Sequence, residues 1–140
     1  MFAKTLFLLC SSVFLMTCSN IKKNNSRNQS EESLYQKWQL ESVESISSAS
    51  KLTDYKSKNL FVTFTKDGRI DFNLDVNSCS GTFKEGANQT LVFNNTDFKC
   101  TQACCDSIKL NYHEVKKYKI EKNTLTLYSD TETFYFKLAQ

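Results

Sequence analysis

The chain has 140 residues, of which 24% are charged and 13% aromatic, and its formal net charge at pH 7 is +3. This small excess, with charges of both signs mixed along most of the chain, excludes a protein built around a basic nucleic-acid-binding surface. The single histidine, His113, gives no basis for a Ser/His/Asp catalytic group. We therefore expect no enzymatic activity, no cofactor, no metal and no nucleic-acid partner.

The N-terminal residues predict an export signal. One basic residue, Lys4, precedes an apolar run over residues 6–16 that is too short to span a bilayer comfortably and is typical of a signal-peptide core. The run ends in the sequence LMTC at residues 15–18, which resembles the lipobox of bacterial lipoproteins. The resemblance implies a signal peptide over residues 1–17 and lipidation of Cys18. An ordinary secretory signal with a stray cysteine and an uncleaved membrane anchor are the alternatives.

Lipid on Cys18 would make the membrane a partner of the protein, because acyl chains supply an affinity that a removed signal peptide cannot. We therefore expect a lipid-anchored protein of the bacterial cell envelope. Ser19, rather than an acidic residue, follows the cysteine. By resemblance to known sorting patterns, this implies the outer membrane, with the domain facing the periplasm. The sequence does not identify an envelope protein partner.

A polar tether follows the lipidation site. Residues 20–32 contain a single apolar side chain, Ile21, so we predict a flexible linker over residues 18–34. Residues 35–140 remain. They number about a hundred, which is enough for one domain with a modest core.

The folded part is predicted to be mostly strand. Leu60, Val62 and Phe64 alternate with Phe61, Thr63 and Thr65, and apolar residues alternate with polar ones over residues 70–76. The Asp67-Gly68 pair between these two runs is a strong hairpin signal. Weaker alternation follows, with a turn near Glu85. Further short strands carry the apolar pairs or triplets Trp38/Leu40/Val43, Phe83 with Leu91/Phe93, Tyr118/Ile120, Leu125/Leu127 and Phe134/Phe136/Leu138. Short strands with close turns indicate an antiparallel barrel or sandwich. Asp71 and Asp75 are expected on the outward face of the second strand, as solubilising groups.

One segment interrupts the strands. Residues 101–115 contain no turn residue, and Cys104, Ile108, Tyr112 and Val115 follow helical spacing. We predict a single helix there, with Cys104 on its buried face and His113 on its solvent side. The predicted fold class is thus mainly β with one helix, as an antiparallel, barrel-like sheet.

The order of these elements resembles the META domain, or HslJ-like, family. The sequence KWQLESV at residues 37–43 is similar to the W-x-L start of that family, and the hairpin at residues 60–72 follows as it does there. The sequence NSCSGTF at residues 77–83 resembles the G-C-N-x-x-x-G-x-Y stretch, with Asn77 near the usual glycine position. The most specific match is residues 115–128, which resemble V-x-x-Y-x-I-x-G-x-x-L-x-L, with Asn123 near the usual glycine. A lipocalin-like small barrel is the alternative, since it too begins with a tryptophan strand.

The resemblance implies a barrel-like antiparallel sheet with one helix packed on it, in a protein associated with the cell envelope. It also implies a link to envelope stress tolerance. It supplies no reaction, because the family has no agreed catalytic residues. A META-like domain over residues 35–140 is the expectation that follows.

The cysteines are predicted to be structural. Removal of the signal peptide and lipidation take away Cys10 and Cys18, and an even number of cysteines in an oxidising compartment favours disulfides. The four candidates are Cys79, Cys100, Cys104 and Cys105. The family resemblance implies the pair Cys79–Cys100. Either of the other two cysteines could replace Cys100, because four cysteines allow three pairings.

Two chemical alternatives remain for the same cysteines. The spacing C-x₃-C is compatible with a metal site, but two adjacent cysteines on a helix point about 100° apart and would not both reach one ion. Thiol–disulfide exchange is the other, because a helix N-terminus favours the thiolate of Cys104 or Cys105. No C-x-x-C motif in a βαβ pattern supports that second alternative.

Two classes of function are compatible with these observations. The first is a non-enzymatic envelope module with a structural or interaction role. The second is a small-ligand-binding barrel, which needs a cavity lined by apolar side chains that the core does not use. A filled interior would favour the first class, and an open apolar cup the second.

Overall fold

The computed structural model describes residues 33–47 and 49–140. The predicted signal peptide, the predicted lipidation site Cys18 and nearly all of the predicted tether lie outside these residues. Within the described part, no helix is long and apolar enough to cross a membrane. In chain order the elements are β1 (Lys37–Ser45), β2 (Lys51–Asp54), β3 (Phe61–Phe64), β4 (Arg69–Asn73), β5 (Ser78–Gly86), the 3₁₀ turn η1 (Ala87–Gln89), β6 (Thr90–Phe93), β7 (Lys99–Cys100), the 3₁₀ turn η2 (Tyr112–Glu114), β8 (Lys117–Glu121), β9 (Thr124–Tyr128) and β10 (Glu132–Leu138).

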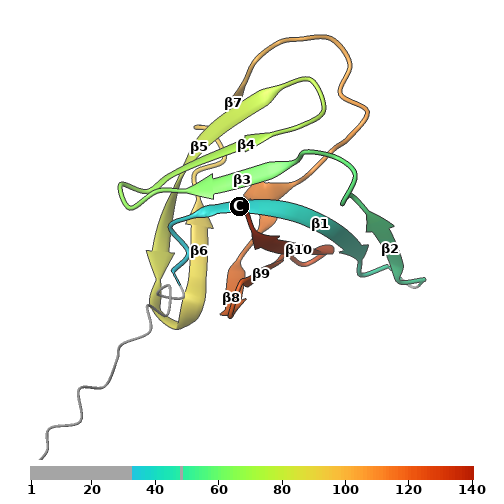
Figure 1. The fold of residues 1–140 in the computed structure, drawn as a ribbon. Helices are drawn as coiled ribbons and strands as arrows, with labels where there is room; N and C mark the ends of the chain where they lie inside the picture. The colour runs from blue at the N-terminus through green and yellow to red at the C-terminus, as the bar shows by residue number, and fades with distance from the viewer. Residues whose placement is uncertain (1–32, 48) are drawn as a thin grey trace, which may run out of the picture.

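Eight of these strands form a closed antiparallel barrel. Hydrogen bonds join neighbours in the order β1-β3-β4-β5-β6-β8-β9-β10, and β10 pairs with β1 to complete the circle. The two remaining strands lie outside the circle, β2 against the later part of β1 and β7 against β5 (Figure 1). The predicted barrel-like antiparallel sheet is therefore confirmed, whereas the two short strands outside the circle were not predicted.

The first strand closes the barrel because it pairs along both edges. One edge pairs with β10 over nearly its whole length, with a register shift between Leu40 and Ser42. The other edge pairs with β3 at residues 37–39 and with β2 at residues 42–45. The bend in β1 that Figure 1 shows is consistent with this shift, because an irregular register bends a strand.

Alternation along the strands places the core inside the barrel. The hairpin of β3 and β4 follows the predicted pattern, with Val62, Phe64, Ile70 and Phe72 buried. Its turn requires Gly68, which has a φ of +82° and would place a Cβ 2.8 Å from a backbone oxygen. The strand residues at most 1% exposed are Trp38, Leu40, Val62, Phe64, Ile70, Leu125, Leu127, Phe134 and Phe136. The second strand of the hairpin ends at Asn73, three residues earlier than predicted.

The N-terminal end of the core lies slightly earlier than the sequence suggests. Leu34, which we assigned to the tether, is 2% exposed and belongs to the hydrophobic core. Its carbonyl oxygen accepts a hydrogen bond of 3.0 Å from the indole N–H of Trp38. This contact fixes the entry of the chain into β1.

The predicted helix over residues 101–115 is wrong. This segment is an irregular loop that ends in the 3₁₀ turn η2, and Cys105 has a φ of +78°, which no α-helix contains. Backbone N–H groups of the loop donate to distant groups instead of to the preceding turn: Thr101 to the carbonyl of Ser78, for example. The buried residues Ile108, Leu110 and Tyr112 alternate with exposed ones, so the segment packs as an extended chain.

Tyr112 fills the barrel from this loop. Its side chain is 1% exposed, and its ring centroid lies 4.8 Å from that of Phe72, 5.1 Å from that of Phe134 and 6.2 Å from that of Phe136. Burial raises the pKa of its hydroxyl strongly. Within the described part of the chain, the Tyr112 hydroxyl has no hydrogen-bond partner. The ring therefore contributes packing, while the hydroxyl lies in an environment that disfavours a polar group.

Replacement of Tyr112 with phenylalanine is therefore expected to leave the free energy of unfolding unchanged or raise it by about 1 kcal/mol, since burial of an unpaired hydroxyl is unfavourable. Chemical denaturation followed by circular dichroism measures the effect. Tyr112→Ala is the matched control, and it should lower stability by about 3–5 kcal/mol because the aromatic packing is lost. A clear loss of stability in Tyr112→Phe would mean that the hydroxyl has a partner after all.

The barrel is joined least extensively between β6 and β8. Their ladder contains the pair Thr90 and Lys117, and the backbone N–H of Leu91 donates to the carbonyl of Lys116 at 2.8 Å. A polar cluster bridges the same region, because the hydroxyls of Tyr35 and Tyr118 both donate to the carboxylate of Glu85. The hydrogen bond to Glu85 raises the pKa of Tyr35, and burial together with that carboxylate raises the pKa of Tyr118. The cluster thus ties β5 to β8 where the backbone ladder is short.

Candidate functional site: the cysteine loop

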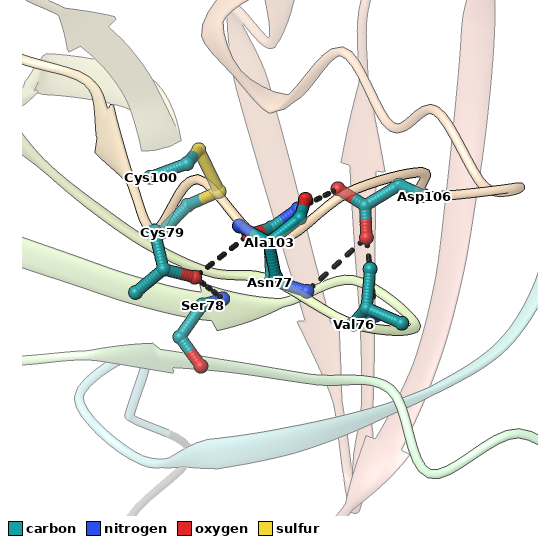
Figure 2. The surroundings of a disulfide bond; sticks show 8 residues. Val76, Asn77, Ser78, Cys79, Cys100, Ala103 and Asp106 are labelled. Atoms are coloured by element: carbon teal, nitrogen blue, oxygen red, sulfur yellow. Dashed lines mark hydrogen bonds between the residues drawn. A yellow bond between two sulfur atoms is a disulfide. The ribbon is translucent and has the colours of Figure 1, made fainter.

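The groups with distinctive chemistry gather around residues 101–111, which connect β7 to η2 and which we call the cysteine loop. It contains Cys104 and Cys105, and it begins directly after Cys100. The turn between β4 and β5 lies against it and contributes Asn77 (Figure 2). The same turn contributes Asp75. All four predicted disulfide candidates lie in or next to this region.

A disulfide joins Cys79 to Cys100 at a separation of 21 residues. The two cysteines lie directly opposite each other in the β5–β7 ladder, so the bond fixes a two-residue strand to the barrel. Cys79 points into the core and is 4% exposed, whereas Cys100 is exposed. This pairing agrees with the one that the family resemblance implies.

The side chain of Asn77 holds the cysteine loop in place. Its amide nitrogen donates to the carbonyl of Ala103 at 2.9 Å and to a carboxylate oxygen of Asp106 at 2.6 Å. Its amide oxygen accepts from the hydroxyl of Thr101 at 2.8 Å and from the N–H of Ala103 at 2.9 Å. The other oxygen of Asp106 accepts from the backbone N–H groups of Val76 and Asn77, both at 3.1 Å (Figure 2). Asn77 is 7% exposed, so its amide is buried with all these partners satisfied.

A second disulfide joins the adjacent residues Cys104 and Cys105. Both residues are exposed, which corrects the expectation that Cys104 is buried beside Ile108 and Val115. The expectation was wrong because it assumed a helix, and Cys104 lies instead at the surface between the two residues that Asn77 holds. The remaining helical-face residues are buried, as expected.

Asp75 holds the cysteine loop at Ser107. This corrects the expectation that Asp75 is a free solubilising group. One of its carboxylate oxygens accepts from the backbone N–H of Ser107 at 2.9 Å and from the Ser107 hydroxyl. The hydrogen bond from that hydroxyl is the largest reason why the pKa of Asp75 lies well below its ordinary value of 3.8. Asp71 forms an ion pair of 2.7 Å with Arg69 at the surface.

The lowered pKa of Asp75 predicts a pH-dependent contribution to stability. Because the folded pKa lies below the unfolded one, the contribution is present above the ordinary value and is lost as the pH falls through the folded pKa. We expect Asp75→Asn to be less stable than the wild type at pH 7, and the difference to shrink in strong acid. Urea denaturation across this range measures it. Ser107→Ala is the matched control and should reduce the effect of Asp75→Asn; an unchanged effect would contradict the assigned contact.

The predicted absence of a metal site stays a prediction. Among residues 33–47 and 49–140, no three or more His, Cys, Asp or Glu side chains are grouped so that they could hold an ion. The four candidate thiols are engaged in disulfides. His113 is on the solvent side, with a side chain that is 43% exposed, and its ring lies 6.1 Å from that of Phe98.

One hollow of the described surface lies on the outside of the barrel. It measures about 400 Å³ and is lined by residues of β1, β3, β4 and β5, most of them outward, among them Lys37, Phe61 and Asp71. The ammonium group of Lys37 lies 4.1 Å from the Phe61 ring centroid. Inside the barrel, the rings of Phe72, Tyr112 and Phe134 contact one another in sequence. The interior is thus occupied by side chains of the protein.

Sequence reasoning missed three residues that build this region: Asn77, Asp106 and Ser107. Asn77 was noted only for the place it takes in a motif. Turn chemistry indicates that Asn and Asp in a turn bond backbone groups, but it does not identify Ala103, which lies 26 residues further along the chain. In the structure, Asp75 and Asn77 both lie in the turn between β4 and β5.

These features define a class of protein: a small, closed antiparallel β-barrel whose longest loop is fastened by a disulfide and a buried asparagine. A family model for the META domain matches residues 32–140, and the chain therefore belongs to the META domain family. The sequence resemblance to that family is confirmed. Comparison with curated proteins finds no match.

Two solved structures are similar to this chain. An NMR structure of a protein from Burkholderia xenovorans is similar with a TM-score of 0.58 and 14% identity, over 81% of this chain and 89% of that one. A crystal structure of a DUF4847 family protein from Bacteroides vulgatus has a TM-score of 0.48 and 12% identity, over 74% of this chain and 92% of that one. At such identities, the first likeness supports the fold alone.

Proposed function

We propose that the protein is a non-enzymatic lipoprotein of the bacterial cell envelope, in which the META barrel has a structural or interaction role. The lipid on Cys18 would hold it at the membrane, and residues 18–34 would serve as the tether. The outer membrane, with the barrel facing the periplasm, is the proposed location. A contribution to envelope stress tolerance is the physiological role that the family resemblance suggests.

The observation that carries this proposal is the disulfide between β5 and β7. Disulfides persist in oxidising compartments and are rare where thiols are kept reduced. Cys79 and Cys100 are held opposite each other by the strand ladder, so the fold itself brings the two thiols together. The predicted export signal at the N-terminus and the disulfide in the barrel support the same compartment from independent parts of the chain.

The structural or interaction role is supported by the filled interior. A barrel that binds a small ligand inside needs a cavity that its side chains leave open. Here Tyr112 enters the barrel and contacts Phe72 and Phe134. A small-ligand-binding barrel of the lipocalin type is therefore the less supported alternative.

The lipoprotein assignment is tested by expression of the full-length chain in a bacterium with lipoprotein processing. The wild type should incorporate labelled palmitate and partition with membranes, and density separation should place it with the outer membrane. Cys18→Ser should abolish labelling and release the protein or stall its maturation. Cys10→Ser is the matched control within the same N-terminal segment, and it should keep full labelling. Absence of label in the wild type would refute lipidation, without bearing on the barrel.

A further inference from the structure

We propose that Cys104 and Cys105 form a redox-active disulfide, a site for thiol–disulfide exchange with the thiols of a partner. The substrate class is a peptide or protein dithiol, which would be oxidised at this site. The inference concerns the cysteine loop and does not depend on the lipid anchor. It is carried by three properties of the loop: the adjacency of the two cysteines, their exposure and the anchoring of the residues on either side.

Adjacency removes the usual structural reason for a disulfide. A disulfide stabilises a fold mainly because it closes a loop and restricts the unfolded chain, and the effect grows with the length of that loop. The Cys79–Cys100 bond spans 21 residues, whereas the Cys104–Cys105 bond spans one. The second bond therefore fastens no distant part of the chain.

Exposure makes the bond accessible to attack. Cys104 and Cys105 are both exposed, whereas the other disulfide has one cysteine, Cys79, buried in the core. Exchange requires a thiolate to approach a sulfur atom directly, so access controls which disulfide reacts. The two disulfides thus differ in access, which is one of the properties on which exchange depends.

The scaffold around the pair would survive opening of the bond. Ala103 and Asp106, the residues on either side, are both held by the side chain of Asn77. Ser107 is held by Asp75. None of these contacts involves a sulfur atom, so the loop keeps its anchors in both redox states.

The exchange is a balanced two-electron step. A partner thiolate attacks one sulfur of the Cys104–Cys105 bond, forms a mixed disulfide and releases the other cysteine as a thiolate. The second thiol of the partner, as its thiolate, then attacks the partner sulfur of the mixed disulfide and releases the remaining cysteine. The partner leaves as a disulfide, and Cys104 and Cys105 become two thiols that take up the two protons the partner loses.

Stepwise reduction of the purified full-length chain tests the inference. The protein is incubated with increasing reduced glutathione, alkylated with a light reagent, fully reduced, alkylated with a heavy reagent and digested. Fragment spectra of the peptides over residues 70–84 and 100–109 assign each cysteine to one label. We expect Cys104 and Cys105 to take the light label at a glutathione concentration at least about tenfold below that needed for Cys79 and Cys100. Equal reduction of both disulfides, or a bond from Cys79 to either adjacent cysteine, would overturn the proposal.

A second measurement tests exchange itself. The wild type, reduced at the pair and then given oxidised glutathione, should recover the bond and retain no glutathione. Cys105→Ser should retain glutathione on Cys104, because the resolving thiol is missing. Cys104→Ser/Cys105→Ser is the control and should retain none, with an unchanged circular dichroism spectrum. A wild type that stays glutathionylated would show that the two thiols do not act as a pair, which would also overturn the proposal.

Discussion

Replacement of Trp38 with alanine is expected to lower the free energy of unfolding by about 3–5 kcal/mol, the usual cost of truncating a fully buried aromatic side chain. Trp38 is 1% exposed and lies on β1, which pairs with β3 on one edge and with β10 on the other. Loss of the indole would leave a cavity at the place where the barrel closes. It would also remove the donor to the Leu34 carbonyl, at 3.0 Å, which fixes the entry of the chain.

Two controls separate these contributions. Trp38→Phe keeps an aromatic ring but not the donor, so it should cost less than the alanine variant. Val92→Ala changes a side chain that is 62% exposed and should lie within about 0.5 kcal/mol of the wild type. Because Trp38 is the single tryptophan, unfolding should be followed by circular dichroism. If Trp38→Ala were as stable as Val92→Ala, the buried Trp38 side chain would not contribute the stability that we assign to it.

Removal of the Cys79–Cys100 disulfide is the second large effect. The double variant Cys79→Ala/Cys100→Ala should lose about 3 kcal/mol, which is the chain-entropy estimate for a loop of this length. The loss acts mainly through the unfolded chain, which gains freedom. The β5–β7 pairing itself should persist at neutral pH, because Asn77 still holds Thr101 and Ala103.

The matched control is the other disulfide. Cys104→Ala/Cys105→Ala removes the same chemical bond from exposed, adjacent residues, and it should cost less than about 1 kcal/mol because almost no chain is closed. Urea denaturation of both double variants and the wild type gives the comparison. Equal losses in the two variants would show that loop closure is not the source of the stabilisation.

Much of the barrel could be predicted because its signals are local. Val62, Phe64, Ile70 and Phe72 alternate with polar residues, and a period of two is enough to define a half-buried strand. The turn at Gly68 needs a positive φ, and the Asp67-Gly68 pair is the sequence signal for such a turn. The very short strand β7 has no such signal, since two residues cannot show a period.

The cysteine loop could not be predicted from local pattern. Its backbone is satisfied by Asn77 and Asp75, which lie about thirty positions earlier, and no periodicity along the loop reports those partners. The coincidence of Cys104, Ile108 and Tyr112 with helical spacing was misleading. The alternation of Ile108, Leu110 and Tyr112 is the better indicator, because buried and exposed residues alternate along this extended chain.

The sequence by itself thus determined the strand content, the hairpin of β3 and β4, the barrel class and the family. These features depend on alternation and turn chemistry, which involve residues that are neighbours in the chain. The sequence also carries the lipobox-like segment from which we predict export. Only the tertiary structure decided which residues face one another across the barrel. That includes the insertion of Tyr112 into the interior, the ladder that sets Cys79 against Cys100 and the bond between Cys104 and Cys105. The physical reason is that the first two contacts join residues far apart in the chain. The Cys104–Cys105 bond joins neighbours, but it lies in a loop whose backbone is held by residues far away in the chain.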